Sequence, residues 1–406
     1  MASQVNSRID QLSSALAART AEVDAWIAKT IPGLPIPFYA SADLRDSGHK
    51  LCCVDLNVFP AGFNNLCETF LARSVDIMRR FIAARFGEAP HERVLVVPEA
   101  HTRNPFYATH LHGLGTLLRN AGLSVWIAAM EGEDGDTPAA LTTHDGTPVP
   151  LTPVRRDGAR IAGVNGEQFD WILLNNDLSA GALEWLEGIL QPIHPPMCLG
   201  WHRRRKSEFF DNYNQTVDEF ASAFSFDPWL LRTFTDVVTG VDFLKQDGIE
   251  RVAAGVAGML GAIQRKYDEY GIADAPQVFV KNNAGTYGIG IMVVQSPDDI
   301  LNMNRRTKNK MSMGKGHTPI REVLLQEAVP TRVQMSGVVM EPVVYTIGTE
   351  VIGSFLRANP ERGAVDNLNA KGMTFYRYCT IDPPATPEEC ICTHDGMTLY
   401  QLVSRL

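Results

Sequence analysis

The sequence has no run of about 18 apolar residues, the length that a helix needs to cross a bilayer. Its first residues are polar and do not resemble a secretory signal peptide, so we expect neither secretion nor a membrane partner. Basic residues are also in deficit, because 37 Lys and Arg stand against 46 Asp and Glu, for a net charge of −9. This balance argues against nucleic acid as the main ligand. We therefore expect a cytoplasmic protein that binds small molecules.

Cysteine is scarce, with seven residues at irregular spacing. An odd number in a long chain is typical of a reducing compartment rather than of a disulfide framework. Cys390 and Cys392, with His394 nearby, have no second pair at the spacing of metal ligands, so we expect no metal site there. Cys52 and Cys53 fall in an apolar run, which predicts that both are buried.

The chain does have length and apolar content. Its 406 residues, 45% of them hydrophobic, are enough for two or three domains. Three prolines and a glycine within residues 191–200 mark a boundary. We predict three regions, over residues 1–195, 196–325 and 326–406.

The first region predicts a parallel sheet. Residues 93–98 read as a short apolar strand, a polar loop and a helix follow, and residues 123–129 read as the next strand. Such a unit has a right-handed crossover, and its ligands bind outside the carboxyl ends of the strands. Arg103 and Asn104 in the loop are therefore candidate substrate residues.

Polar side chains follow two other predicted strands. Asp55 and Asn57 lie before a polar turn at the end of the strand 51–59, and a second polar loop follows the strand 171–174. Asn and Asp also cap turns and helices, so a purely structural role is the alternative for each of these side chains.

The stretch 278–294 has two β-branched apolar runs around a lysine, two asparagines and a Gly-x-x-Gly-x-Gly loop. This pattern predicts strand, glycine-rich turn, strand. Glycines allow backbone N–H groups to approach a phosphate chain, and Lys281 lies where an ammonium would meet phosphate oxygens. A P-loop or Rossmann turn would open a helix, whereas this chain re-enters a strand. The stretch predicts a flap over a nucleotide, with a plain hairpin as the alternative.

Basic residues gather in two places. Residues 203–206 are four consecutive cations at the start of a predicted helix, where they oppose the helix dipole. Either a solvated helix start or a bound polyphosphate would explain them. Residues 302–319 carry five cations in a polar stretch, which we expect to be a mobile basic loop.

Four segments resemble the ATP-binding parts of an ATP-grasp ligase of the glutathione synthetase type. Lys281 with its glycines resembles the flap, and residues 326–330 resemble the adenine-binding hinge. Arg357, followed by residues 367–372, resembles the arginine and the asparagine loop of those enzymes. Lys206 stands where the second ATP lysine of the fold is expected.

Residues 55–65, 284–290 and 367–372 together resemble the proteobacterial-type glutamate–cysteine ligase family, and the resemblance covers nearly the whole chain. It implies an α/β (α+β) fold of the ATP-grasp type with a Rossmann-like pre-ATP-grasp domain at the N-terminus, then the lid with the flap, then the core. It also implies formation of γ-glutamylcysteine through γ-glutamyl phosphate, the first step of glutathione synthesis. The protein would bind ATP, Mg²⁺, L-glutamate and L-cysteine. The resemblance leaves open whether it forms a homo-oligomer.

The same resemblance implies roles for individual residues. The residues expected in catalysis are Lys281, Arg357 and Asn369. Those expected to contact ATP are Lys206, Lys281, Gly285, Thr286, Tyr287, Gly288, Gly290, Gln326, Glu327 and Val329. The late Glu-x-Asn pair that usually holds Mg²⁺ is absent, so the metal ligands are expected to be either carboxylates from elsewhere or Glu341, Asn367 and Asn369. For glutamate, we expect a cation at Arg103 for the α-carboxylate and an acceptor at Asp55 for the ammonium, with Asn57 and Asn104 beside them.

Two rival functions remain at this stage. One is another ATP-grasp amino-acid or peptide ligase, with the same ATP site and a different acceptor. The other is a nucleotide-binding regulatory protein without catalysis, which the missing Glu-x-Asn pair favours and the retained lysines, glycines and asparagines oppose.

Overall fold

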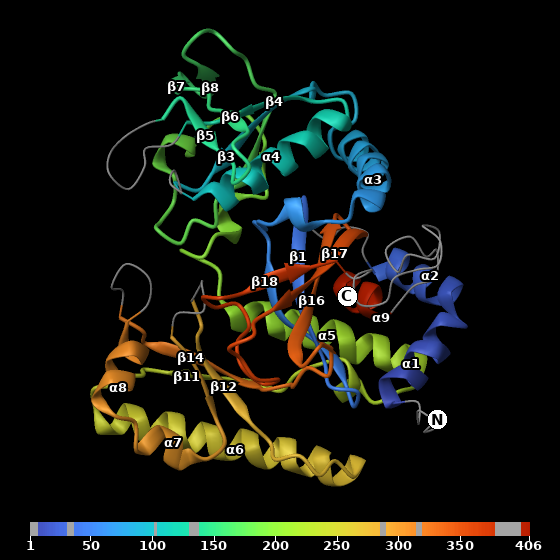
Figure 1. Cartoon of the computed structure of the whole chain (residues 1–406), viewed down its shortest axis with the longest axis vertical. Helices are drawn as coiled ribbons and strands as arrows, with labels where there is room; N and C mark the ends of the chain where they lie inside the picture. Colours follow the sequence, from blue (N-terminus) through green and yellow to red (C-terminus); the bar gives the residue numbers. More distant parts are fainter. Residues whose placement is uncertain are drawn as a thin grey trace.

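The computed structural model describes residues 7–30, 36–100, 104–129, 138–284, 290–313, 319–377 and 399–406. Three sheets follow one another along the long axis of the molecule (Figure 1). A four-stranded parallel sheet lies at the top, a six-stranded antiparallel sheet lies in the middle, and a four-stranded antiparallel sheet lies below it. The fold class is α+β, as expected.

The parallel sheet has the strand order β10-β9-β3-β4. Its strands are β3 (Arg93–Pro98), β4 (Ser124–Ile127), β9 (Trp171–Asn175) and β10 (Ile193–His194), with helices α3 (Glu68–Phe86) and α4 (Pro105–Asn120) beside them. Two hairpins follow β4 in the chain, β5 (Ala140–Thr142) with β6 (Pro148–Pro150) and β7 (Val154–Asp157) with β8 (Arg160–Gly163). The five residues of β9 are all buried, as expected for a strand covered on both faces. The predicted parallel unit β3–α4–β4 is confirmed.

The six-stranded sheet combines both ends of the chain. Its order is β18-β17-β16-β1-β2, with β15 paired to β16. The strands are β1 (Tyr39–Asp46), β2 (Leu51–Asn57), β15 (Gln334–Met335), β16 (Val338–Ile347), β17 (Glu350–Ala358) and β18 (Thr374–Tyr376). Strands of the first predicted region therefore complete a sheet of the third. The boundaries at residues 195 and 325 stay a prediction.

The lower sheet has the order β11-β14-β12-β13. Its strands are β11 (Thr235–Thr239), β12 (Val278–Asn282), β13 (Ile291–Val294) and β14 (Glu322–Glu327). Helices α6 (Gln246–Tyr270), α7 (Pro297–Leu301) and α8 (Arg305–Ser312) flank it (Figure 1). The expected strand–turn–strand is confirmed, because β12 and β13 pair antiparallel. The expected basic loop is wrong over Arg305–Ser312, where Asn304 caps a helix through a bond from Thr307 N to its Oδ1.

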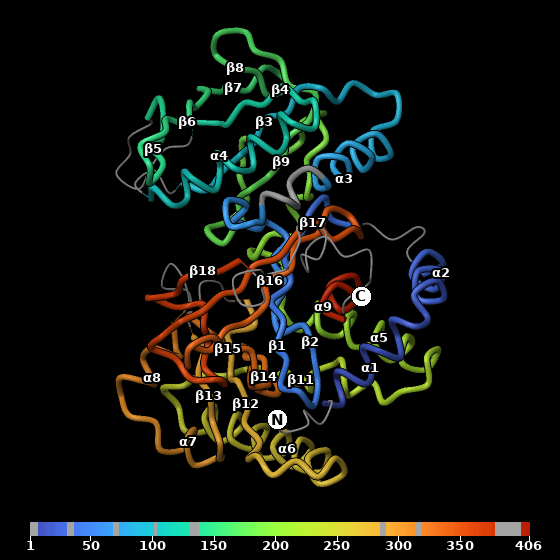
Figure 2. The backbone as a smooth tube through the Cα atoms, turned by 45° about the vertical axis from the view of Figure 1, so that its right-hand side comes forward, coloured from blue at the N-terminus to red at the C-terminus, as the bar shows by residue number. Residues whose placement is uncertain are grey.

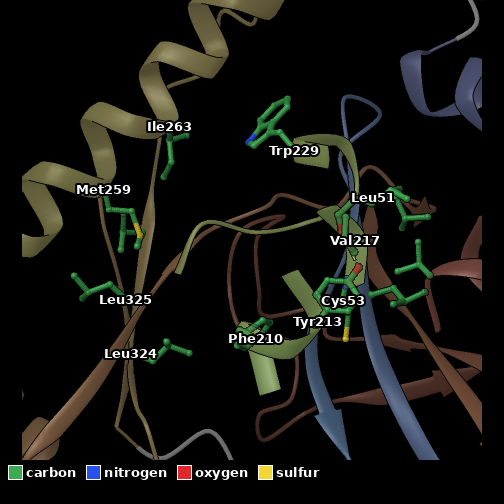
Figure 3. Close-up of a cluster of buried hydrophobic side chains, with 14 of the residues drawn as sticks. Leu51, Cys53, Phe210, Tyr213, Val217, Trp229, Met259, Ile263, Leu324 and Leu325 are labelled. Carbon is green, nitrogen blue, oxygen red and sulfur yellow. Dashed lines mark hydrogen bonds between the residues drawn. The ribbon is translucent and has the colours of Figure 1, made fainter. Parts of the chain in front are cut away.

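A large hydrophobic cluster joins the lower sheet to the middle one (Figure 3). On one side, Met259 and Ile263 of α6 face Leu324 and Leu325 of β14. On the other side, helix α5 (Lys206–Phe224) contributes Phe210, Tyr213 and Val217, which lie beside Leu51 and Cys53 of β2. Helix α5 therefore lies within the core that links the two sheets, and its first residue is carried to their junction. Cys52 and Cys53 are buried, as predicted.

The two ends of the described chain pack together. Helices α1 (Arg8–Ala17) and α2 (Thr20–Thr30) lie near the C-terminal helix α9 (Leu399–Arg405) (Figure 2). Arg332 binds Asp10 of α1 at 2.8 Å and Asp46 of β1 at 2.9 Å, which fastens the N-terminal helix to the middle sheet. No helix within the described ranges is long and apolar enough to cross a membrane.

A second cluster covers part of the middle sheet. Val343, Tyr345 and Phe355 of this sheet pack with Phe63 and with α4 beneath the parallel sheet. Farther along the same strands, the side chains on this face become charged instead of apolar. That charged part is where the candidate site lies.

Candidate active site

Strand register places charged side chains next to each other on the middle sheet. Glu341 of β16 faces Arg357 of β17, and Asp43 of β1 faces Asp55 of β2. Residues opposite each other on neighbouring strands have their side chains on the same face. We call Asp43, Arg45, Glu341 and Arg357 the arginine–carboxylate cluster. We call Asp55, Lys206 and Lys281 the lysine cluster.

The arginine–carboxylate cluster is balanced in charge. Arg357 Nη1 donates to Asp43 Oδ2 at 2.6 Å and to Glu341 Oε1 at 2.9 Å. Arg45 Nε donates to the other oxygen, Glu341 Oε2, at 2.6 Å. Burial acts to lower the pKa of Arg357, but Asp43 and Glu341 outweigh it and raise that pKa above its ordinary value. Two arginines and two carboxylates therefore hold one another in place.

Arg45 also fixes the loop that contains the predicted asparagines. Its Nη1 donates to Ala364 O at 2.8 Å and its Nη2 to Asp366 O at 2.7 Å. Farther along, the buried Asn359 Nδ2 donates to Lys371 O at 3.2 Å. The loop is thus held at both ends, and its first residues lie against the arginine–carboxylate cluster.

The lysine cluster has more positive than negative charge. Lys206 Nζ donates to both oxygens of Asp55, at 2.6 and 2.7 Å. Lys281 has no carboxylate in hydrogen-bond contact within the part of the chain that the structure describes, and its Nζ reaches only Val54 O at 3.4 Å. Burial lowers the pKa of Lys281 to about 8, with Asp55 acting in the opposite direction. Burial would raise the pKa of Asp55, but Lys206 and Lys281 outweigh it and hold that pKa below its usual value.

Asn283, directly after β12, ties the two lysines together. Its main-chain oxygen accepts from Lys206 N at 2.9 Å, and its Oδ1 accepts from Ser207 N at 2.9 Å. Its Nδ2 donates to Ser207 Oγ at 2.9 Å and also to Glu322 of β14. The first amides of α5 are therefore used by the end of the strand that carries Lys281. A tandem Asn-Asn after a strand was visible in the sequence, but its partner on α5 was not.

The predicted adenine hinge is buried at the end of β14. Gln326 Nε2 donates to Val54 O at 3.4 Å, and its buried Oε1 has no hydrogen-bond partner among the described residues. The Glu327 carboxylate lies in the core, where it accepts from Lys50 Nζ at 2.8 Å and from Trp229 Nε1 at 3.2 Å. The side chain of Glu327 therefore has a structural role, and Val329 is buried beside it.

Two of the three residues predicted to bind Mg²⁺, Glu341 and Asn367, have side-chain oxygens that already accept hydrogen bonds. Both oxygens of Glu341 accept from arginines, at 2.6 and 2.9 Å. The Asn367 Oδ1 accepts from Asn369 N at 3.1 Å. Across the described ranges, no group of three His, Cys, Asp or Glu side chains is arranged to hold a metal. Glu341 is the one carboxylate among the three, and both of its oxygens are paired with arginines, so the set does not fit Mg²⁺ and we derive no step through it.

The remaining predicted residues fall into two groups. Asn104 caps α4 by accepting from Phe106 N at 3.1 Å, and Asn57 accepts from Phe59 N at 2.9 Å, so both side chains have local structural roles. Gly290 has φ +69 and its oxygen accepts from Asn282 N at 3.0 Å, which closes the hairpin. The other predicted residues, Arg103, Gly285, Thr286, Tyr287 and Gly288, lie outside the described residues.

Sequence reasoning missed Asp43, Arg45 and Lys50. Their signal was present, because charged residues alternate with apolar ones at the end of β1 and in the turn after it. Arg45 and Lys50 are buried, at 4% and 2% exposure, so each needs a partner inside the protein. The sequence could not name the partners, which lie 296 and 277 residues away.

Comparison with known proteins identifies the family of this chain. The model of the GshA glutamate-cysteine ligase family matches residues 13–406. The chain belongs to this family. Its members are ligases that use ATP, so the protein is an ADP-forming ligase. A comparison with curated protein sequences finds no match.

Among solved structures, this chain is similar to a candidate gamma-glutamylcysteine synthetase from Methylobacillus flagellatus KT. The two share 37% identity over 99% of this chain and 95% of the other, with a TM-score of 0.87. D-alanyl-alanine synthetase A from Vibrio cholerae matches at 10% identity over 74% and 78% of the chains, with a TM-score of 0.36. A glutathione synthetase-like effector from Globodera pallida matches at 12% identity over 88% and 85%, also with a TM-score of 0.36. The last two similarities are too low to support an argument.

Proposed function

We propose that this protein joins the γ-carboxylate of L-glutamate to the amine of L-cysteine, with ATP converted to ADP and γ-glutamyl phosphate as the intermediate. The proposal is supported by membership of the glutamate-cysteine ligase family. One observation in the site carries it: two buried lysines, Lys206 and Lys281, converge on the single carboxylate of Asp55. An excess of buried positive charge calls for an anion, and the reaction brings a carboxylate and a triphosphate together.

The chemistry sets what these residues must do. A carboxylate does not react with an amine at neutral pH, so it is first activated by phosphoryl transfer, and the amine of cysteine then displaces phosphate. Lys281 and Lys206 would offset the charge of the transferring phosphoryl group, which is mostly a matter of positioning and electrostatics. The hairpin β12–β13 would hold the phosphates with its backbone and exclude water from the acyl phosphate.

Arg357 would act from a fixed position. Its Nη1 is held by Asp43 and Glu341, while its buried Nε has no hydrogen-bond partner within the described ranges. That Nε leaves one donor for a developing negative charge, and the two carboxylates keep the guanidinium from turning. Asn369, on the loop held by Arg45, would complete this side of the site.

ATP would lie with its phosphates at the lysine cluster and its adenine near the end of β14. Gln326 has a free acceptor, the buried Oε1, and Val329 lies two residues beyond the strand. Mg²⁺ stays a prediction, because Glu341, the one carboxylate proposed for it, is bound by Arg45 and Arg357. The cytoplasmic setting and a homo-oligomeric state also stay predictions.

The decisive test is ADP release by the purified protein with glutamate alone, with cysteine alone and with both. We expect release only when glutamate is present, a faster rate with cysteine, and transfer of ¹⁸O from the labelled γ-carboxylate into phosphate. 2-Aminobutyrate should replace cysteine at a cost of roughly 1–3 kcal/mol, because it has a methyl in place of the thiol. ADP formation that ignores glutamate but needs another amino acid would support the rival ligase. Binding of ATP with no ADP under any acceptor would support the regulatory protein.

A further inference from the structure

Arg204 lies beside the lysine cluster and has no assigned role. It belongs to the turn that precedes α5, where its backbone N donates to Gly200 O at 2.9 Å. Its guanidinium carbon lies 4.9 Å from the centre of the Trp201 ring and 5.8 Å from that of Phe209. Its Nη1 is buried and has no hydrogen-bond partner in the described part of the chain. A guanidinium that packs near two aromatic rings and has an unused donor can bind an anion.

Within the part of the chain that the structure describes, Arg204 forms no ion pair with a carboxylate. Lys206 Nζ lies 4.8 Å from the centre of the same Trp201 ring and takes both oxygens of Asp55. The other nearby acid, Glu208, accepts from Arg205 N at 3.1 Å and is exposed. Burial lowers the pKa of Arg204, and Asp55 only partly offsets this. Three cations, Arg204, Lys206 and Lys281, thus share one carboxylate.

We propose that Arg204 binds the α-carboxylate of the glutamate substrate, with Asp55 accepting from its α-ammonium. This inference rests on the proposed function. Asp55 is suited to the second part, because 42% of its side chain is exposed although Lys206 contacts both of its oxygens. The two lysines remain for the γ-carboxylate as it is phosphorylated. Arg204, Asp55 and the two lysines then complement the α-carboxylate, the α-ammonium and the γ-carboxylate of glutamate.

An amino acid explains this arrangement better than a phosphate chain does. A phosphate chain carries no positive charge to pair with Asp55, whereas an α-amino acid carries an ammonium beside its carboxylate. The zwitterionic head of an α-amino acid instead satisfies both groups at once. The planar fork of a guanidinium also matches a carboxylate in a bidentate pair, and its burial makes the contact specific.

The test compares Arg204→Ala and Arg204→Lys with the matched control Arg203→Ala, which removes an exposed arginine of the same turn. Initial rates are measured with glutamate and with 4-aminobutyrate, which is glutamate without its α-carboxylate. For Arg204→Ala we expect the KM for glutamate to rise on the order of 10²-fold, with the KM for ATP nearly unchanged. The preference for glutamate over 4-aminobutyrate should fall by a similar factor. Arg204→Lys should lie between, because it keeps the charge and loses the fork.

Each other outcome overturns the assignment. A raised KM for ATP with an unchanged KM for glutamate would make Arg204 a phosphate contact. Unchanged values for both would make it a structural stacking residue, and an effect of Arg103→Ala on glutamate alone would move the α-carboxylate to that position. If Arg204→Ala does not fold, Arg204→Lys and calorimetric titration of glutamate decide. If the wild-type protein itself ignores glutamate, the proposed function fails, which is distinct from a failure at Arg204.

Discussion

At the scale of single residues, Lys281 is an ionisable group buried away from solvent. It is 7% exposed, and among the described residues its one hydrogen bond is to the main-chain oxygen of Val54, at 3.4 Å. Burial lowers its pKa to about 8 from the ordinary lysine value of 10.5. An anion bound beside it would reverse that shift, because a nearby negative charge favours the ammonium form. Binding of ATP and protonation of Lys281 are therefore linked.

The first prediction concerns pH. For the free enzyme, kcat/KM for ATP should fall as pH rises above about 8, since neutral Lys281 no longer attracts phosphate. The fall above pH 8 should be smaller in kcat, because bound ATP raises the pKa of Lys281. Lys281→Arg should move this fall in kcat/KM to higher pH. A wild-type profile without the fall would contradict a phosphate role for Lys281.

Stability should change in the opposite sense to ATP binding. The folded pKa of Lys281 is below its unfolded value, so between pH 8 and 10.5 the unfolded state binds more protons. The free energy of unfolding of the ligand-free protein therefore gains from this group as pH rises through that window. Denaturant titrations of wild type and Lys281→Met at pH 7.5 and 9.5 would separate this contribution.

At the scale of elements, buried pairs fasten the two antiparallel sheets to each other. Lys50, in the turn between β1 and β2, binds Glu327 at the end of β14 at 2.8 Å, with both side chains at most 2% exposed. Lys50 Nζ also lies 4.2 Å from the centre of the Trp229 ring, and Trp229 donates to the same carboxylate. The hinge strand β14 is therefore held against the hairpin β1–β2, which carries Asp43 and Asp55.

The second prediction separates structure from binding at this pair. Glu327→Ala should destabilise the protein by roughly 3–5 kcal/mol, because it leaves the Lys50 ammonium buried without a partner. The double variant Lys50→Met with Glu327→Leu should recover much of that loss, since no charge is stranded. Urea unfolding measures both, and the KM for ATP of the folded double variant should stay close to wild type. A large rise in the KM for ATP would instead indicate that Glu327 contacts the nucleotide.

At the scale of the whole molecule, the chain does not divide cleanly along its sequence. Strand β1 lies between β2 and β16, so the N-terminal hairpin forms one side of the sheet that also holds Arg357. Ala42 and Leu44 of this hairpin share a core cluster with Val344 of β16 and Leu402 of α9. The site forms only when both ends of the chain are present.

The third prediction tests this directly. A chain that begins at residue 196 should not unfold cooperatively, because β16 would have an unpaired edge and its core face would be open to water. Circular dichroism during heating and hydrogen exchange of β16 would report it. Adding residues 1–195 as a separate chain should restore protection on β16. A cooperative transition of residues 196–406 alone would instead support the predicted boundaries as folding units.

Local patterns in the sequence determined the elements that depend on near neighbours. The apolar run 93–98, the Asn104-Pro105 start of α4 and the glycine hairpin after Lys281 each follow from propensities that act over a few residues. The basic stretch after β13 showed the limit of this, because polarity alone did not distinguish the short helix α8 from a loop. Tertiary structure decided which distant groups meet. Arg357 reaches Asp43 across 314 residues, and Lys206 reaches Asp55 across 151. No local propensity specifies such pairs, because strand order and the packing of α5 determine which charged side chains are close. A buried charge is then stabilised by the oppositely charged group that the fold places beside it.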